Sequence, residues 1–340
     1  MQNRIMLTIC LLWAGSVLAQ PSPNYHLVKK TVVGGEGGWD YLMADADGGR
    51  LYLSHGTQVE VLNLRTHQKI GVVKPTPGVH GIAVVPSANV GYTTNGRTHS
   101  ATLFDLKTLQ PSREIPTGLK PDAIRYDAFS GRVFIFNNEG NSATVLEAAT
   151  GKVVGTVELG GAPEAAVSDD NGLLFVNLED KNEVVVFDAN TLAVKHRWPL
   201  GTGQEPTGLA FDQARHRLFS TCHNQQMIVL DSQSGKVLAT VPIGSGVDGA
   251  VFDTATGSAI SSNGEGSLTV VRETKPGQFE AIQTLPTQRG ARTITIDPVS
   301  HHIFVITADY GTAPAPTAEN PRPRPSVLPD TFVLLEYGID

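Results

Sequence analysis

The sequence predicts an all-β protein, a seven-bladed β-propeller built from four-stranded antiparallel blades. The first observation behind this prediction is a repeat, because seven copies of one unit align on the residue that ends the third strand of each copy. These residues are Asn63, Asp105, Glu147, Asp188, Asp231, Arg272 and Glu336. They are spaced by 41–43 residues, apart from a last interval of 64 residues. A period of about 40–45 residues with four short strands per unit is typical of a propeller.

The second observation is the order of strands and turns within a unit. An inner strand, such as 123–127 or 208–212, is followed by a turn like DAFSGR or DTATGS, in which Asp and Gly favour a tight reversal. Apolar third strands such as VVVF and FVLL suit sheets that neighbouring blades cover on both faces. A fourth strand, such as 153–159, closes the unit. The sequence lacks helix-length amphipathic segments, which excludes a TIM barrel and a doubly wound fold.

The predicted second strands carry a signature of their own. They are LYLSH (51–55), GYTTN (91–95), VFIFN (133–137), LFVNL (174–178), LFSTC (218–222), AISSN (259–263) and IFVIT (303–307). The segments VFIFN, GYTTN and LYLSH most closely resemble the Tyr-Val-Thr-Asn motif of YVTN-repeat propellers, a YncE-like family of exported proteins. The resemblance covers essentially the whole chain after residue 19. It implies a seven-bladed propeller, and it is specific for the fold rather than for an activity.

The two ends of the chain are predicted to share the seventh blade. The last unit ends with the strand at 331–338 and has no outer strand after it, whereas YHLVKKTVV at 25–33 is a strand without a unit. Pairing these two strands would close the ring and protect two open sheet edges. An insertion at 311–330 carries six prolines, so it is predicted to be a loop. That loop is either solvated without a role, or a lid or partner-binding arm.

Residues 1–19 are predicted to be a secretory signal peptide. Arg4 supplies a positive region, residues 5–12 are apolar, and Val17 and Ala19 stand where a signal peptidase selects small residues. Residues 20–340 would then form a single propeller domain, periplasmic or secreted. An uncleaved anchor is the alternative reading of the segment. No later stretch is apolar enough to cross a bilayer.

Charge and cysteine content narrow the classes of partner and chemistry. The net charge is −7, and −8 without Arg4, which argues against wrapping a nucleic acid. Cys222 is the only cysteine outside the signal segment, so an intrachain disulfide is excluded and a buried thiol is favoured over a nucleophile. Nucleophile elbows, P-loops and zinc-protease motifs are missing from the sequence. A monomer without a membrane span is expected.

A ring of candidate ligand-binding residues is predicted at the mouth of the central channel, just before each inner strand. The ring consists of Asp40, His80, Asp122, Glu164, Thr207, Asp248 and Arg292. Two carboxylates about 8 Å apart repel by roughly 2 kcal/mol at an effective dielectric of about 20, so four need compensation. Solvent with Arg292, a bound cation, or protonation in an acid–base site would each supply it. Oxygen ligands favour Ca²⁺ or Mg²⁺, and His80 alone does not make a zinc site.

A second ring of candidates comes from the turns after the second strands, which share a face with the first ring. It consists of His55, Asn95, Asn137 with its neighbour Asn138, Glu179, His223, Asn263 and Asp309. Both histidines of this ring are interpreted as surface turn residues in preference to ligands. Because the insertion at 311–330 follows one of these turns, it is predicted to lie on the same face.

Three functions remain compatible with these patterns. The first is a binding or scaffold propeller that takes a small polar ligand or a protein partner at the channel mouth, with no catalysis assigned and no cofactor beyond Ca²⁺ or Mg²⁺. The second is a hydrolase that resembles propeller lactonases, with or without a divalent metal. The third is a binder of single-stranded DNA, which the negative charge and the presence of only Trp39 and Trp198 after the signal segment disfavour.

Overall fold

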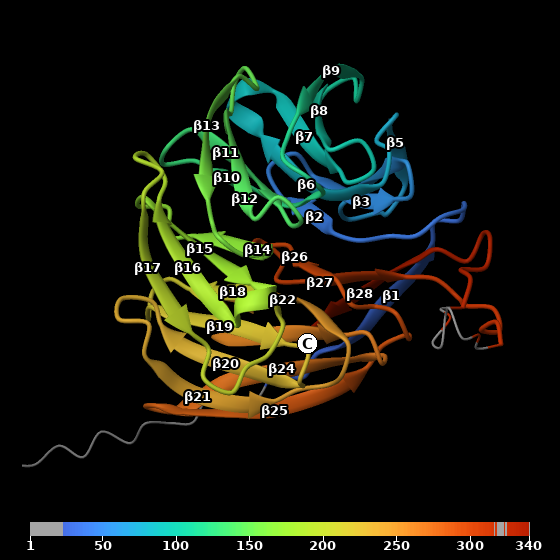
Figure 1. Cartoon of the computed structure of the whole chain (residues 1–340). Helices are drawn as coiled ribbons and strands as arrows, with labels where there is room; N and C mark the ends of the chain where they lie inside the picture. Colours follow the sequence, from blue (N-terminus) through green and yellow to red (C-terminus); the bar gives the residue numbers. More distant parts are fainter. Residues whose placement is uncertain (1–22, 316, 318–322, 324, 340) are drawn as a thin grey trace, which may run out of the picture.

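The computed structural model describes residues 23–315, 317, 323 and 325–339. Within these ranges it shows seven four-stranded antiparallel sheets arranged in a ring (Figure 1), so the predicted seven-bladed propeller is confirmed. The predicted signal segment, residues 1–19, lies outside the described residues.

The blades are numbered here in chain order of their inner strands. Blade 1 contains β2 (Leu42–Asp45), β3 (Arg50–His55), β4 (Gln58–Asn63) and β5 (Lys69–Val73). Blade 2 contains β6 (Val79–Val85), β7 (Val90–Asn95), β8 (Ser100–Asp105) and β9 (Pro111–Pro116). Blade 3 contains β10 (Pro121–Asp127), β11 (Arg132–Asn137), β12 (Ser142–Glu147) and β13 (Val153–Glu158). Each of these sheets pairs in the simple order of the sequence.

The next three blades repeat the pattern. Blade 4 contains β14 (Pro163–Ser168), β15 (Leu173–Leu178), β16 (Glu183–Asp188) and β17 (Val194–Pro199). Blade 5 contains β18 (Pro206–Asp212), β19 (Arg217–Cys222), β20 (Gln226–Asp231) and β21 (Val237–Pro242). Blade 6 contains β22 (Val247–Asp253), β23 (Ser258–Asn263), β24 (Ser267–Lys275) and β25 (Gln278–Pro286). The inner strands contact one another around the whole ring, including β2 with β26 (Ile294–Ile296) of blade 7.

Blade 7 joins the two ends of the chain. It is made of β26, β27 (Ile303–Thr307), β28 (Val333–Gly338) and β1 (His26–Val32), in that order from the channel outward. The antiparallel pairing of β1 with β28 brings Thr31 opposite Leu334, and Figure 1 shows the blue N-terminal strand beside the red C-terminal one. The Tyr25 hydroxyl also donates a 2.5 Å hydrogen bond to Asp253, which attaches the start of the described chain to blade 6.

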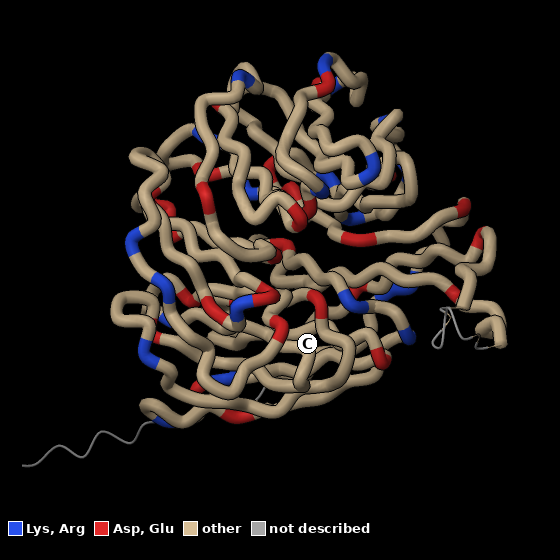
Figure 2. The backbone as a smooth tube through the Cα atoms, in the orientation of Figure 1, with Lys and Arg blue, Asp and Glu red and all other residues tan. Residues whose placement is uncertain are grey.

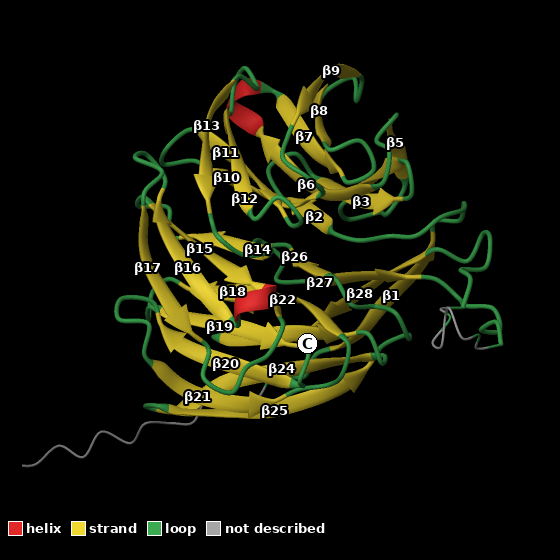
Figure 3. Cartoon of the chain, in the orientation of Figure 1, coloured by secondary structure: helices red, strands yellow, loops and turns green. Residues whose placement is uncertain are grey.

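Almost all of the described chain is strand and turn (Figure 3). The described helical segments are two 3₁₀ turns, η1 (Pro86–Ala88) and η2 (Glu179–Lys181). Among the described residues, no helix has the length and hydropathy needed to cross a bilayer.

The core is divided among the blade interfaces, because each pair of neighbouring blades buries one apolar cluster between its facing sheets. Between blades 3 and 4, for example, the rings of Phe134 and Phe187 lie 5.4 Å apart. Cys222 belongs to the cluster between blades 4 and 5, and burial raises the pKa of its thiol to about 12. This cysteine is therefore buried, as predicted.

The proline-rich insertion is anchored at both of its ends. Tyr310 and Val327 form an isolated antiparallel bridge, and the Asp330 amide donates a 2.8 Å hydrogen bond to the Gly35 carbonyl. The Tyr310 ring lies 5.9 Å from the ring of Trp39, next to the channel mouth. The described ends of this segment therefore pack against the apolar cluster between blades 7 and 1.

Candidate functional site

Five of the seven predicted channel-mouth residues lie at irregular points of the inner strands, whereas Asp40 and Arg292 precede β2 and β26 as predicted. In blades 2–6 each is the second residue of its strand, which corrects the prediction that it precedes the strand. The residue just before the mouth residue still pairs with the second strand, as Pro121 does with Asn137. The register of the pairing then shifts between Pro121 and Ile124. Equivalent shifts occur in the other four blades. A β-bulge of this kind re-aims the local side chain, here toward the channel.

Hydroxyl groups of the second strands satisfy the backbone of these irregular segments. The Ser54 hydroxyl accepts a 2.8 Å hydrogen bond from the Asp40 amide. The Thr94 hydroxyl accepts one of 2.7 Å from the Gly81 amide and donates one to the Asp122 carbonyl in the next blade. The Thr of the YVTN-like strand GYTTN thus connects two adjacent mouth positions. The site is therefore held by its scaffold rather than by mobile loops.

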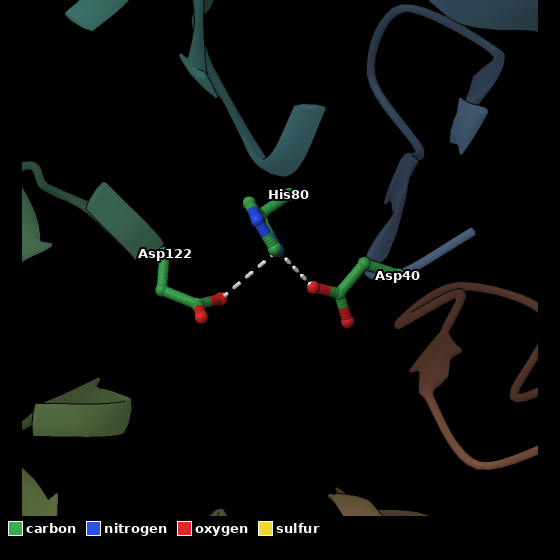
Figure 4. A group of neighbouring side chains, drawn as sticks. All are labelled: Asp40, His80 and Asp122. Atoms are coloured by element: carbon green, nitrogen blue, oxygen red, sulfur yellow. Dashed lines mark hydrogen bonds and ion pairs between the residues drawn. The ribbon is translucent and has the colours of Figure 1, made fainter. Parts of the chain in front are cut away.

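Three mouth residues from blades 1, 2 and 3 come together (Figure 4). Nδ1 of His80 forms a hydrogen bond with a carboxylate oxygen of Asp40 and lies 3.5 Å from Oδ1 of Asp122. One potential ligand atom from each residue lies within 4.8 Å of the other two. Asp122 is buried, while Asp40 and His80 are half-buried. Asp40, His80 and Asp122 are called the triad below.

Arg292 of blade 7 compensates the acids on the other side of the mouth. Its Nε donates a 2.7 Å hydrogen bond to Asp248, and one of its terminal nitrogens lies 3.9 Å from Asp40. The same guanidinium donates to the Trp39 carbonyl at 3.2 Å. Asp248 is therefore the acid of the ring that has a permanent cation as its direct partner.

The two remaining mouth residues have local partners. Glu164 accepts a 2.8 Å hydrogen bond from the Asn138 amide group, and Thr207 is buried and donates a 3.1 Å hydrogen bond to the Val247 carbonyl. Figure 2 shows acidic positions on the strands near the centre of the ring. Five of the seven mouth residues thus carry carboxylate or imidazole groups that are not matched by an equal number of permanent cations.

The pKa values of the mouth residues record this excess of negative charge. Burial, followed by the charge of Asp40, raises the pKa of Asp122 to about 7. Burial and neighbouring carboxylates also raise the pKa of Glu164 well above its usual range, and that of Asp248 despite its Arg292 partner. For His80, burial lowers the pKa, but the hydrogen bond to Asp40 and the charges of both triad acids outweigh this effect and raise it. Positive charge is therefore favoured at the mouth.

Tyr41 lies directly below the mouth, and the sequence patterns did not single it out. Although it belongs to blade 1, its ring packs against the apolar cluster of blades 3 and 4, so it reaches across the channel. Burial and the four nearby carboxyl groups raise the pKa of its hydroxyl. Below it, the channel forms a cavity of about 400 Å³ whose walls include Ile82, Leu209 and Ile294. The polar mouth therefore opens onto a channel with mixed walls, which also include Arg125, Asp170 and Gln213.

The triad has the composition of a small divalent-cation site. It offers one imidazole nitrogen and two carboxylates, and the 3.5 Å separation of His80 Nδ1 from Asp122 is compatible with both atoms binding one ion at about 2.0–2.2 Å. Carboxylates suit Mg²⁺, Ca²⁺ and Mn²⁺, and an imidazole adds affinity for Zn²⁺ and other transition metals. A protonated His80 bridging the two acids is the competing arrangement, because it also brings positive charge between them.

Three asparagines of the predicted second ring have their side chains inside the blades. Asn95, Asn137 and Asn263 are fully buried, and each donates to hydroxyls of the adjacent third strand. The closest acceptors are Thr102 at 2.8 Å, Thr144 at 3.0 Å and Thr269 at 3.0 Å, respectively. The Asn of the YVTN-like motif thus joins two strands instead of facing the mouth. The Ser-x-Thr pattern that opens the third strands SATLF, SATVL and SLTVV is the sequence signal for this pairing.

The other members of the second ring are spread over the same face. His55 is buried and stacks on Phe332, with ring centroids 4.2 Å apart. The rest lie in turns: Glu179 at the start of η2, His223 at 3.2 Å from Glu205, and Asp309 as the acceptor of a 2.8 Å hydrogen bond from Gln288. None of these residues joins the triad. The structure thus brings together part of the first ring and disperses the second.

Comparisons with known proteins agree with the fold. No family model matches the chain. Relatives named as the uncharacterized protein YncE are 26% identical over 148 residues in Salmonella typhi and Salmonella typhimurium, and 25% identical in Escherichia coli K12. The match covers 40% of this chain and 42% of each relative, less than half of their length. Hydrazine synthase of Kuenenia stuttgartiensis superposes with a TM-score of 0.71 at 15% identity, over 86% of this chain and 95% of that one.

These likenesses and the ring of blades define the class of protein. The structural match shows the fold alone, a seven-bladed repeat propeller. Together with the YVTN-like strands, the partial sequence match shows that the chain is similar to the YncE proteins.

Proposed function

We propose that the chain is an exported binding propeller whose ligand lies at the channel mouth and includes a divalent cation held by Asp40, His80 and Asp122. The convergence of these three side chains in a mouth with surplus carboxylates is the observation that carries the proposal. Two ionised carboxylates with oxygens within 4.8 Å repel by about 3 kcal/mol at an effective dielectric of about 20. A divalent ion between them removes this repulsion and adds three ligand bonds.

Millimolar Mn²⁺, Zn²⁺, Ca²⁺ or Mg²⁺ is expected to raise the melting temperature relative to chelator, because a ligand that binds only the folded state stabilises it. The gain is about 2.7 kcal/mol when the ion is at a hundred times its Kd. The double variant Asp40→Asn with Asp122→Asn should lose the response. Asp248→Asn is the matched control from the same ring and should keep the response, since Arg292 and not the ion is the partner of Asp248.

Two results would count against this assignment. If none of the four ions changes the melting temperature of the parent protein, the result supports a protonated His80 between Asp40 and Asp122 instead of a metal ion. A response that survives the double variant places the ion elsewhere on the molecule.

A metal-assisted hydrolase that resembles propeller lactonases is the second candidate. The observation in its favour is the convergence of Asp40, His80 and Asp122, which could hold a divalent ion that activates a water molecule. Three protein ligands would also leave coordination positions open for water, as in catalytic metal sites. A lactone assay with metal-loaded protein separates this candidate from a binding protein, which should show no turnover.

Export to the periplasm or the medium is the remaining part of the proposal. Its support is the signal-like composition of residues 1–19 and the likeness to exported propellers. The intact mass of protein recovered outside the cytoplasm is expected to correspond to a chain that starts at Gln20. Retention of Met1 in that protein would contradict a cleaved signal.

A further inference from the structure

A cavity of about 410 Å³ lies beside the triad at the channel mouth, and its rim carries basic residues. Asp40 and His80 form part of its wall, and Arg97, Lys120 and Arg292 line it as well. A site built only for a cation would not be expected to place three basic side chains around that cation. Their presence points to a second ligand with negative charge.

The basic side chains differ in how far they are already neutralised. Arg292 is held by Asp248 at 2.7 Å. Among the described residues, the ion pair of Lys120 is a long, exposed contact of 3.7 Å to Glu139, which also lines the cavity. Arg97 is exposed and has no ion pair among the residues that the structure describes. Once a divalent ion neutralises the two triad acids, Arg97 and Lys120 therefore remain as positive charge around the cavity.

Glycines make room for this cavity. Gly38, Gly56, Gly78 and Gly96 all line it, and their backbones are connected by hydrogen bonds of 2.8 Å, 3.1 Å and 2.9 Å from each amide to the preceding glycine carbonyl. A Cβ atom at Gly96 would come within 2.7 Å of the His80 ring. These residues keep the space next to the imidazole free of side chains.

We infer that a small oxyanion, a carboxylate or a phosphate, occupies this cavity, binds the triad-held metal ion directly and is held by Arg97 and Lys120. The inference rests on the proposed function, because the ion supplies the first contact. Three protein ligands leave positions of a four- to six-coordinate ion open. The cavity borders the triad at His80, so an oxygen ligand can reach these positions while basic side chains bind the other oxygens.

The test uses the intact protein, Mn²⁺, and two anions, succinate and inorganic phosphate. Electron paramagnetic resonance measures free Mn²⁺ and hence its affinity, and water-proton relaxation reports water on the bound ion. Each anion that occupies the cavity is expected to displace metal-bound water and to tighten Mn²⁺ binding by about tenfold, because coupling between two ligands is reciprocal. The anion with the larger effect identifies the source of the oxyanion.

Charge-removing variants distinguish this site from a general effect on folding. Arg97→Gln and Lys120→Gln should each weaken anion binding by about tenfold, since a hydrogen bond to a charged group is lost. The same changes should leave Mn²⁺ affinity unchanged or make it tighter, because a positive charge near the ion is removed. Lys236→Gln, in an exposed turn between β20 and β21, is the matched control and should alter neither affinity.

Each contrary result has a separate meaning. If Mn²⁺ binds to the parent protein but neither anion displaces water, the oxyanion site is wrong while the proposed metal site stands. Variants that weaken Mn²⁺ and anion binding together would show a structural role for Arg97 and Lys120, and this too overturns the oxyanion site. If Mn²⁺ does not bind to the parent, both the metal site and the inference fail.

Discussion

Deletion of residues 332–340 is expected to abolish cooperative folding. It removes β28, the strand between β27 and β1, together with the buried side chains of Phe332, Leu334, Leu335 and Tyr337. Burial of each such side chain contributes about 1.5–3 kcal/mol, so the loss approaches the 5–15 kcal/mol that stabilise a typical domain. The exposed edges of β27 and β1 should also promote aggregation. Thermal melting followed by circular dichroism is expected to show no cooperative transition.

The control for this deletion is a chain that begins at Pro23. It keeps β1 and β27, the two strands that pair with β28. Its melting temperature is therefore expected to equal that of the full-length chain. A chain that ends at residue 331 and still melts like the parent would show that closure by the two terminal strands is not required.

Gly208→Ala is expected to lower the free energy of unfolding by about 2–3 kcal/mol or more, because overpacking at a rigid contact is costly. Gly208 follows the mouth residue Thr207, and a Cβ atom there would lie 2.6 Å from the amide nitrogen of Ala250 on the neighbouring inner strand. Backbone cannot move away as a flexible side chain can. Strands β18 and β22 would have to separate, which would widen the mouth between Thr207 and Asp248.

Gly38→Ala provides the matched control with the opposite sign. It has an ordinary backbone conformation, and a Cβ atom there meets nothing within 4 Å. Alanine restricts the unfolded chain, so stability should stay unchanged or rise by up to about 1 kcal/mol. Urea titration of both variants measures the difference. Equal stability of the two variants would show that the inner strands do not approach each other as closely as described.

Much of the fold could be predicted because a repeat constrains every copy at once. Second strands such as 133–137 differ from the observed strand Arg132–Asn137 by one residue, and the closing strand predicted at 25–33 is observed at His26–Val32. Alternation of strands and turns at a fixed period leaves little freedom in register. The same patterns identified the ring of mouth residues, because equivalent positions of a closed repeat surround one axis.

The grouping of those mouth residues could not be predicted from their spacing. Equal spacing treats Asp40, His80 and Thr207 alike, yet His80 turns toward two acids while Thr207 bonds to a backbone carbonyl. Side-chain direction depends on the bulge and on the local partner, and neither has a period of its own. Asn95 shows the same limit, because its position suggested a turn residue on the mouth face while its hydrogen bonds hold it inside the blade. Arg97 was missed because the pattern selected Asn95 from the same turn.

The pairing of β1 with β28 also has a consequence for how the protein is made. His26 is synthesised 312 residues before its partner Gly338 (338 minus 26). At about 5–20 residues per second, roughly 15–60 s pass between these two events. Throughout that interval blade 7 is incomplete, and the strand 26–32 carries a hydrogen-bonding edge without its partner. A helper protein that shields this edge during biogenesis would therefore act on a strand that is made long before its partner.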